Sequence, residues 1–315
     1  MDPLQHLDLL LRYDRSFNLR HSVRSVVGAG ARVLDAGCGL GLLSYWAIES
    51  GASRVVAVDM EGIDLARALA VENGYGGAID FIQTDLSSVD LPEEPSSFDV
   101  ILAMVYLNDP RRDDDACQLT FKLRDRYLVP GGTMLPDRVR YFAQACDWPT
   151  QDYRTRIHRW ESQIAELQDR YGFRFGALQD SILSGTWSRM FPVEKNSGRF
   201  NLDGVKLMTT AQLVHEVDYS AEEEPFPTRF SVPIDSSGMI NAILWRQDLW
   251  SQDRLLFSND SISWITDPIM VKGGDAIELH LGEQWRKTNA VDVYDGKLGG
   301  SDQGFESKFR RAVRR

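Results

Sequence analysis

Three alternate glycines follow a short apolar run in the stretch from Arg32 to Asp59, RVLDAGCGLGLLSYWAIESGASRVVAVD. Gly37, Gly39 and Gly41 let the backbone approach a ligand where side chains would block it, and a helix beginning behind them points its N-terminal N–H groups at that ligand. The second apolar run ends on Asp59, a position from which a carboxylate accepts hydrogen bonds from ribose hydroxyls. These residue types and spacings predict a nucleoside site.

An acid before the first glycine indicates which nucleoside is bound. The dinucleotide fingerprint is spaced G-x-G-x-x-G, whereas this chain has DAGCGLG. Asp35 would repel a pyrophosphate but attract an ammonium group. The pattern D-x-G-x-G-x-G resembles the first motif of class I S-adenosylmethionine methyltransferases, whose cofactor carries an ammonium and no phosphate. The resemblance implies that Asp85, in the segment TDL, contacts adenine, and that Met60 and Leu86 belong to the same cofactor site. A tight strand–helix turn without a ligand is the alternative, and Asp59 and Asp85 disfavour it.

The elements that must position these residues alternate between strand and helix over residues 32–135. Short apolar runs predict strands, and the segments that close near a glycine predict helices; the strands are RVLDAG, RVVAVD, IDFIQTD and FDVILAMVY, and the helices are GLLSYWAIESG and GIDLARALAVENG. This alternation predicts a doubly wound parallel sheet. Residues 4–27 predict one or two further helices. After about residue 145, a charged amphipathic helix and then short alternating runs predict an antiparallel β domain.

The second half of the chain narrows the resemblance to protein arginine methyltransferases. GGTMLPDRVRYF resembles their connection into a β-barrel, HRWESQ and DRYGFRFGALQD their dimerisation arm, and LMTTAQLVHEVDYS and GMINAILWRQDLW their barrel strands. HLDLLLRYDR resembles their first helix and places His6 and Arg15 in the cofactor site, where Arg15 would meet the cofactor's carboxylate.

This resemblance covers nearly the whole chain and implies its organisation. It predicts a Rossmann-like α/β domain followed by an antiparallel β-barrel domain with a helical dimerisation arm. The expected bounds are 1–30 for helices covering the cofactor, 31–143 for the S-adenosylmethionine domain and 144–315 for the barrel domain, with the arm at about 153–195. A homodimer formed through this arm is expected.

Two departures from the family concern the methyl acceptor. The family holds the arginine guanidinium between two glutamates, because a planar cation pairs best with carboxylates. When the family's hairpin is aligned with the segment FDVILAMVYLNDPRRDDDACQL, its first glutamate falls on Met104 and its second in the acidic run 113–115. The family's Thr-His-Trp loop becomes Ile-Ser-Trp, with Ser263 in place of histidine, and the aspartate that pairs with this histidine falls on Arg12.

We therefore expect a methyltransferase that acts on a small molecule of specialised metabolism. The protein must align a nucleophile with the methyl group and exclude water. Tyr106, Asp113, Asp114, Glu161 and Ser263 are the candidate catalytic residues, and Met104, Tyr106, Asn108 and Trp264 are the candidate substrate contacts. A divergent protein arginine N-methyltransferase, with the Asp run supplying the carboxylates, is the first alternative. A catalytically inactive cofactor-binding partner subunit is the second.

The composition of the chain argues against several other classes of protein. The chain has 35 Lys and Arg against 46 Asp and Glu, a formal net charge of −11, which argues against a nucleic-acid-binding surface. Its three cysteines show neither a disulfide framework nor a zinc spacing, so no metal is expected. The charged N-terminus is not a secretory signal, and no apolar run has membrane-spanning length. We expect a soluble, cytoplasmic protein.

Overall fold

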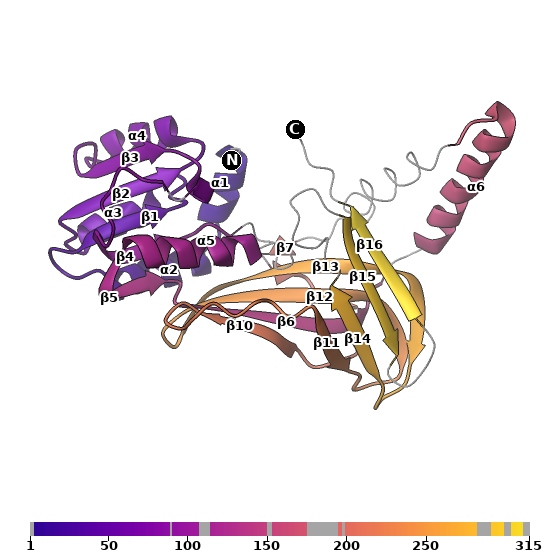
Figure 1. Ribbon diagram of the computed structural model, residues 1–315. Helices are drawn as coiled ribbons and strands as arrows, with labels where there is room; N and C mark the ends of the chain where they lie inside the picture. Colours follow the sequence, from indigo (N-terminus) through magenta and orange to yellow (C-terminus); the bar gives the residue numbers. More distant parts are fainter. Residues whose placement is uncertain are drawn as a thin grey trace.

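The computed structural model describes residues 3–88, 90–106, 114–149, 153–174, 195–196, 199–281, 291–298 and 304–310. Figure 1 shows an α/β domain, drawn from indigo to magenta, beside a curled antiparallel β domain drawn mainly in orange and yellow. Helix α6 (Tyr153–Tyr171) follows the first strand of the β domain in sequence and extends away from both domains. This arrangement confirms the expected fold, a Rossmann-like domain followed by an antiparallel barrel-type domain.

The first domain is built on a parallel sheet in the order β3-β2-β1-β4-β5. Its strands are β1 (Arg32–Ala36), β2 (Arg54–Asp59), β3 (Ile79–Gln83), β4 (Phe98–Ala103) and β5 (Leu128–Leu135). The chain runs outward from β1 to β3 and then returns to the other side of β1, so the strand order reverses between β1 and β4. A crevice at the carboxyl ends of the strands on either side of such a reversal is the usual ligand site of this architecture.

The helices that flank this sheet include two that begin directly after the glycines of the predicted helical segments. The flanking helices are α1 (Pro3–Leu10), α2 (Tyr13–Val26), α3 (Leu42–Glu49), α4 (Ile63–Glu72) and α5 (Asp114–Tyr127), with a short 3₁₀ turn η1 (Leu86–Ser88). Gly41 and Gly62 precede α3 and α4 with φ of 82° and 77°. Only glycine adopts this left-handed conformation without strain, so each glycine lets the chain turn sharply from a loop into its helix.

The second domain begins immediately after the parallel sheet. One antiparallel sheet has the order β10-β6-β12-β13 with β9 beside β6, and its strands are β6 (Arg138–Asp147), β9 (Lys206–Leu207), β10 (Gln212–Asp218), β12 (Gly238–Ser251) and β13 (Arg254–Val271). A second has the order β11-β14-β15-β16, with β11 (Arg229–Pro233), β14 (Ala276–Leu281), β15 (Val291–Leu298) and β16 (Gly304–Arg310); β7 (Lys195–Asn196) pairs with β8 (Arg199–Phe200). The domain boundary expected at residue 143 falls inside β6, since β6 already pairs with β12 from Arg138 onward.

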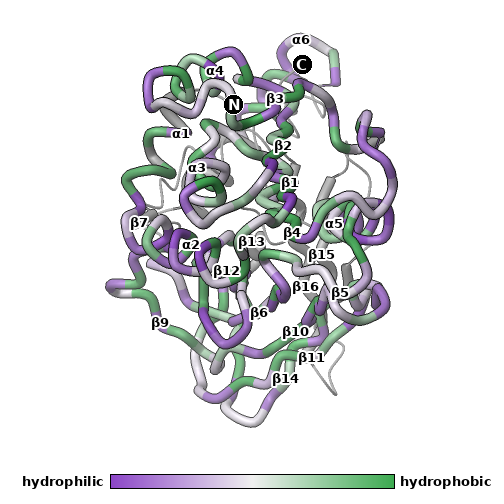
Figure 2. The backbone as a smooth tube through the Cα atoms, turned by 90° about the vertical axis from the view of Figure 1, so that its left-hand side faces the viewer, coloured by the Kyte–Doolittle hydropathy of each residue, from purple (hydrophilic) through white to green (hydrophobic). Residues whose placement is uncertain are grey.

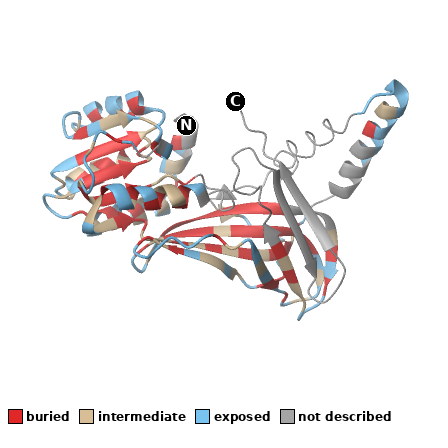
Figure 3. Cartoon of the chain, in the orientation of Figure 1, coloured by how far each residue is buried: buried red, intermediate tan, exposed pale blue. Residues whose placement is uncertain are grey.

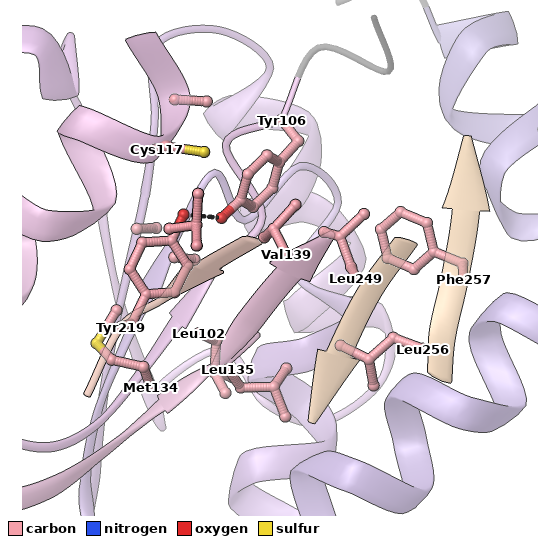
Figure 4. Close-up of a cluster of buried hydrophobic side chains, with 14 of the residues drawn as sticks. Leu102, Tyr106, Cys117, Met134, Leu135, Val139, Tyr219, Leu249, Leu256 and Phe257 are labelled. Atoms are coloured by element: carbon pink, nitrogen blue, oxygen red, sulfur yellow. Dashed lines mark hydrogen bonds between the residues drawn. The ribbon is translucent and has the colours of Figure 1, made fainter. Parts of the chain in front are cut away.

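The two domains share one continuous hydrophobic core. Buried residues follow the parallel sheet and continue along the long strands of the antiparallel sheet (Figure 3). Leu102 and Leu135 of the first domain belong to the same cluster as Val139, Leu249 and Leu256 of the second (Figure 4). Hydrophilic segments gather at the outer loops in Figure 2. Because apolar burial is the main stabilising contribution, this shared core fixes the barrel against the ligand-binding edge of the parallel sheet.

Two further expectations concern the periphery of the fold. The amphipathic helix predicted within RTRIHRWESQIAELQDRYGF is α6, which covers the first part of the expected arm; residues 175–194 lie outside the described residues. None of the helices in the described part of the chain is both long and apolar enough to cross a membrane.

Candidate active site

A cavity of about 280 Å³ lies at the carboxyl ends of β1, β2 and β4. Ten of the residues expected in the site line it, and they come from the N-terminal helices, the glycine turn and the loops after β2, β3 and β4; they are His6, Arg15, Gly37, Gly39, Asp59, Met60, Asp85, Leu86, Met104 and Tyr106. The structure thus joins in one cavity residues that are separated by up to 100 positions in the sequence.

The glycine turn forms one wall of this cavity at close range. A Cβ on Gly37 would lie 2.8 Å from the carbonyl oxygen of Met104, and a Cβ on Gly39 would lie 2.9 Å from Cε1 of His6. Both glycines have positive φ, 77° and 55°. The backbone N–H of Gly39 donates to Oδ2 of Asp59 at 2.9 Å. A larger residue at either glycine would therefore push apart the elements that enclose the cavity.

A partly buried cation, Arg15, enters the cavity from the helical side. The guanidinium of Arg15 lies 4.6 Å from the centre of the Phe257 ring, and both residues line the cavity. Burial, together with the charge of Arg12, lowers the pKa of Arg15 to about 10. Among the described residues, none accepts a hydrogen bond from Nε of Arg15. A buried charge is costly unless it is paired, so this position favours an anionic group on the ligand.

Two residues of the motif support the cavity without lining it. Asp35 is completely buried, and its Oδ2 accepts a 2.6 Å hydrogen bond from Oγ of Ser44 on α3. Burial raises the pKa of Asp35 to about 7, although the Ser44 hydroxyl opposes this shift. Gly41 is the residue before α3 and lies outside the cavity lining.

The end of β4 provides the remaining wall, on the side where the acceptor is expected. Met104, Val105 and Tyr106 line it, together with Leu119 of α5. Each of these four side chains is uncharged. Ser263 does not line the cavity; it is 1% exposed, and its Oγ accepts a 2.9 Å hydrogen bond from the Trp245 indole N–H.

Several of the predicted site residues lie outside what the structure describes. The residues Asn108 and Asp113 fall in the undescribed segment 107–113, and the side chains of Asp114, Glu161 and Trp264 are likewise not described. Their predicted roles in the acceptor site remain predictions.

Arg12 connects the helices over the cavity to the barrel domain. Its Nη2 donates to the carbonyl oxygen of Ser258 at 3.3 Å and to Oδ1 of Asn259 at 3.2 Å. Six residues along the chain, Nδ2 of Asn18 donates to the carbonyl oxygen of Leu256 at 3.2 Å. The positions where the family has a histidine–aspartate pair are thus occupied here by Ser263 and Arg12, which use separate partners.

Sequence patterns missed part of the cavity lining. Phe257 comes from the barrel strand β13, more than 240 residues beyond the Arg15 guanidinium that covers its ring. Leu119 lies on α5, and Cys38 lies between two of the motif's glycines. A single aromatic residue in an alternating strand carries no local signal of a ligand site, whereas Cys38 could have been inferred from its place in the turn.

Comparison with known proteins identifies the first domain. Residues 33–132 match the family described as "Methyltransferase domain". Residues 33–132 form a methyltransferase domain. This match spans the glycine turn, Asp59 and Asp85, and it confirms the expected S-adenosylmethionine-binding domain at the cavity.

The chain is similar in sequence to protein arginine methyltransferases over part of its length and shares their fold over nearly all of it. Ribosomal protein arginine N-methyltransferase rmt3 of Schizosaccharomyces pombe is 28% identical over 225 residues, which are 69% of this chain and 37% of that protein. Protein arginine methyltransferase 10 of Arabidopsis thaliana has the same fold, with a TM-score of 0.68 and 20% identity over 98% of this chain and 97% of that one. A PRMT1 enzyme–prozyme heterotetrameric complex with AdoHcy from Trypanosoma brucei gives a TM-score of 0.66 and 17% identity over 97% of both chains.

These similarities confirm the resemblance and correct one expectation. The chain spans between 37% and 56% of the lengths of the curated relatives it matches. Those relatives are named protein arginine N-methyltransferases, from Dictyostelium discoideum and rice as well as yeasts. The expectation of a small-molecule acceptor is therefore contradicted. It rested on a few altered positions, Met104, Ser263 and Arg12, and these weigh less than sequence similarity over about two thirds of the chain.

Proposed function

We propose that this protein is an S-adenosylmethionine-dependent protein arginine N-methyltransferase. One observation carries the proposal: the cavity combines a glycine cradle, the Asp59 carboxylate and the partly buried Arg15 guanidinium within a fold that matches arginine methyltransferases over nearly the full chain. The similarity of sequence to named arginine methyltransferases supports the choice of acceptor.

The residues of the cavity fit the ribose, the carboxylate and the adenine of S-adenosylmethionine. Asp59 would accept hydrogen bonds from the ribose hydroxyls, and its carboxylate is held toward the turn by the N–H groups of Gly39 and Glu61 at 2.9 and 3.3 Å. Arg15 would pair with the carboxylate, and Asp85 lies on the wall expected to meet the adenine. When bound, the cofactor supplies a methyl group on a sulfonium, which is already a strong electrophile.

The chain's own contribution to the reaction is alignment and exclusion of water. Apolar residues, among them Leu9, Leu43 and Phe257, close most of the cavity around the cofactor site. Carboxylates that face a guanidinium would orient it through paired hydrogen bonds. Met104 supplies no such group, so we assign this role to the acidic run at Asp113 and Asp114.

Transfer of labelled methyl groups tests the proposal directly. The protein is incubated with labelled S-adenosylmethionine and a glycine- and arginine-rich peptide, and the hydrolysed peptide is analysed for methylarginine. We expect methylarginine from this peptide and none from the same peptide with lysine in place of arginine. Asp59→Ala, which removes the expected ribose contact, should abolish the signal. Cofactor binding without transfer to arginine would contradict the proposal and favour a partner subunit.

Two substitutions test which residues hold the guanidinium. Asp113→Asn and Asp114→Asn are expected to reduce kcat/KM for the peptide by about tenfold or more, because a charge-assisted hydrogen bond is lost. Asp115→Asn is the matched control, since Asp115 is exposed on α5. Met104→Glu should raise kcat/KM, whereas the neutral Met104→Gln should not.

We further propose that two copies associate through α6, as the resemblance implies. The heterotetrameric state of the Trypanosoma brucei complex supports association in this architecture. Light scattering on the full chain should give twice the mass of the 315-residue protomer. A monomeric mass at micromolar concentration would contradict this assembly.

A further inference from the structure

Two tyrosine hydroxyls meet where the barrel domain contacts the cavity wall. Tyr106 follows β4 and lines the cavity, whereas Tyr219 follows the barrel strand β10. Their hydroxyl oxygens are 2.5 Å apart in a buried hydrogen bond, which Figure 4 draws as a dashed line. This bond joins the wall on the acceptor side to a residue 113 positions further along the chain.

Tyr219 is held firmly enough to act as a fixed point. It is 2% exposed, and its backbone N–H donates to the carbonyl oxygen of Asp137 at 2.9 Å. Nη1 of Arg124 donates to the carbonyl oxygen of Tyr219 at 2.8 Å, and the Phe121 ring packs edge-on against its ring at 4.9 Å. Contacts from α5 and from Asp137, the residue before β6, thus restrain its backbone and its ring. A side chain locked in this way can position another.

Tyr106, in contrast, ends a short segment that leaves the sheet. Met104 is anchored to β1, because its N–H donates to the carbonyl oxygen of Ala36 at 2.9 Å. Tyr106 comes two residues later, directly before the segment 107–113 that carries the predicted acceptor residues. The hydroxyl pair therefore provides a second anchor for residues 104–106, at the end nearest those acceptor residues.

We propose that Tyr219 is a positioning residue for the methyl acceptor: its hydroxyl fixes Tyr106 and thereby the cavity wall that follows β4. This inference rests on the proposed function for the identity of the acceptor. The cofactor contacts at Asp59 and Arg15 arise from other elements, so the bond acts on the acceptor and leaves cofactor binding unchanged.

The test compares Tyr219→Phe with the parent in steady-state methyl transfer to the arginine-rich peptide. Removing one hydroxyl should raise the acceptor KM about tenfold, which corresponds to the loss of one hydrogen bond. The kcat and the Kd for S-adenosylhomocysteine should both stay within twofold of the parent values. Tyr106→Phe should have the same effect, and the double variant no more than either single one. Tyr127→Phe is the matched control, because its buried hydroxyl accepts from the Leu91 N–H at 2.8 Å, outside the cavity lining.

Hydrogen exchange gives a readout that does not require activity. In Tyr219→Phe, amides in peptides covering residues 104–106 should exchange faster, while those of β2 stay unchanged. If the parent methylates no arginine substrate, the proposed function fails and exchange alone decides the positioning role. Unchanged exchange over residues 104–106, or additive KM effects in the double variant, would overturn the inference.

Discussion

Asp35 should make the stability of this protein fall as the pH rises. Its side chain is completely buried beside Ser44, and burial raises its pKa to about 7 from an ordinary value of 3.8. The folded protein therefore holds a proton that the unfolded chain has already released. The contribution of protonated Asp35 is fully present below about pH 4 and is lost as the pH rises through 7. The total loss corresponds to roughly 4 kcal/mol at 1.36 kcal/mol per pKa unit.

Asp35→Asn isolates this contribution because the amide cannot ionise. Between pH 5.5 and 8 the parent should lose about 2 kcal/mol of unfolding free energy relative to the variant. Urea denaturation of the ligand-free chain at both pH values measures the difference, since other titrating groups are common to both proteins. Asp64→Asn, a change at an exposed surface pair with Arg67, should show no such dependence on pH. Parallel stability profiles for parent and Asp35→Asn would refute the reasoning.

Further predictions concern the cofactor and are measured by calorimetric titration with S-adenosylhomocysteine. Gly39→Ala should weaken binding at least tenfold, because the backbone there has a positive φ and the added Cβ would lie 2.9 Å from the His6 ring. The control is Gly28→Ala, which should bind normally because no atom lies within 4 Å of its added Cβ. Arg12→Met removes two hydrogen bonds between the residue that precedes α2 and β13 and should raise Kd roughly tenfold, the equivalent of one bond from a charged donor. The control is Arg24→Met, which breaks only an exposed ion pair with Glu49 and should leave Kd unchanged. A comparable rise in Kd in this variant would show that loss of the Arg12 hydrogen bonds does not explain the weaker binding.

The acceptor shows where inference from single positions fails. Met104 lines the cavity as expected, yet the absence of a glutamate there, together with Ser263 and Arg12 in place of the family's histidine–aspartate pair, led us to expect a small-molecule acceptor, which the comparisons contradict. A guanidinium site is formed by several groups from different segments. Losing one carboxylate does not define a new substrate when a neighbouring run can supply another.

The sequence by itself determined the parallel sheet, the glycine turn and the carboxylate of Asp59 at the end of β2. Each depends on residues close together in the chain: apolar runs that bury as strands, glycines that adopt positive φ, and an acid at a strand's end. Local patterns of this kind survive in any tertiary context that keeps the strand–turn–helix unit.

Only the tertiary structure decided what surrounds that unit. It turned Asp35 into the interior beside Ser44, brought Phe257 under Arg15, and joined Tyr106 to Tyr219. The last two contacts join the α/β domain to the barrel, and they depend on how the shared core seats one domain against the other. The alternation of side chains in a strand predicts which of them are buried, but it does not predict which distant residue each will contact. For that reason only the folded chain shows which barrel residues belong to the site.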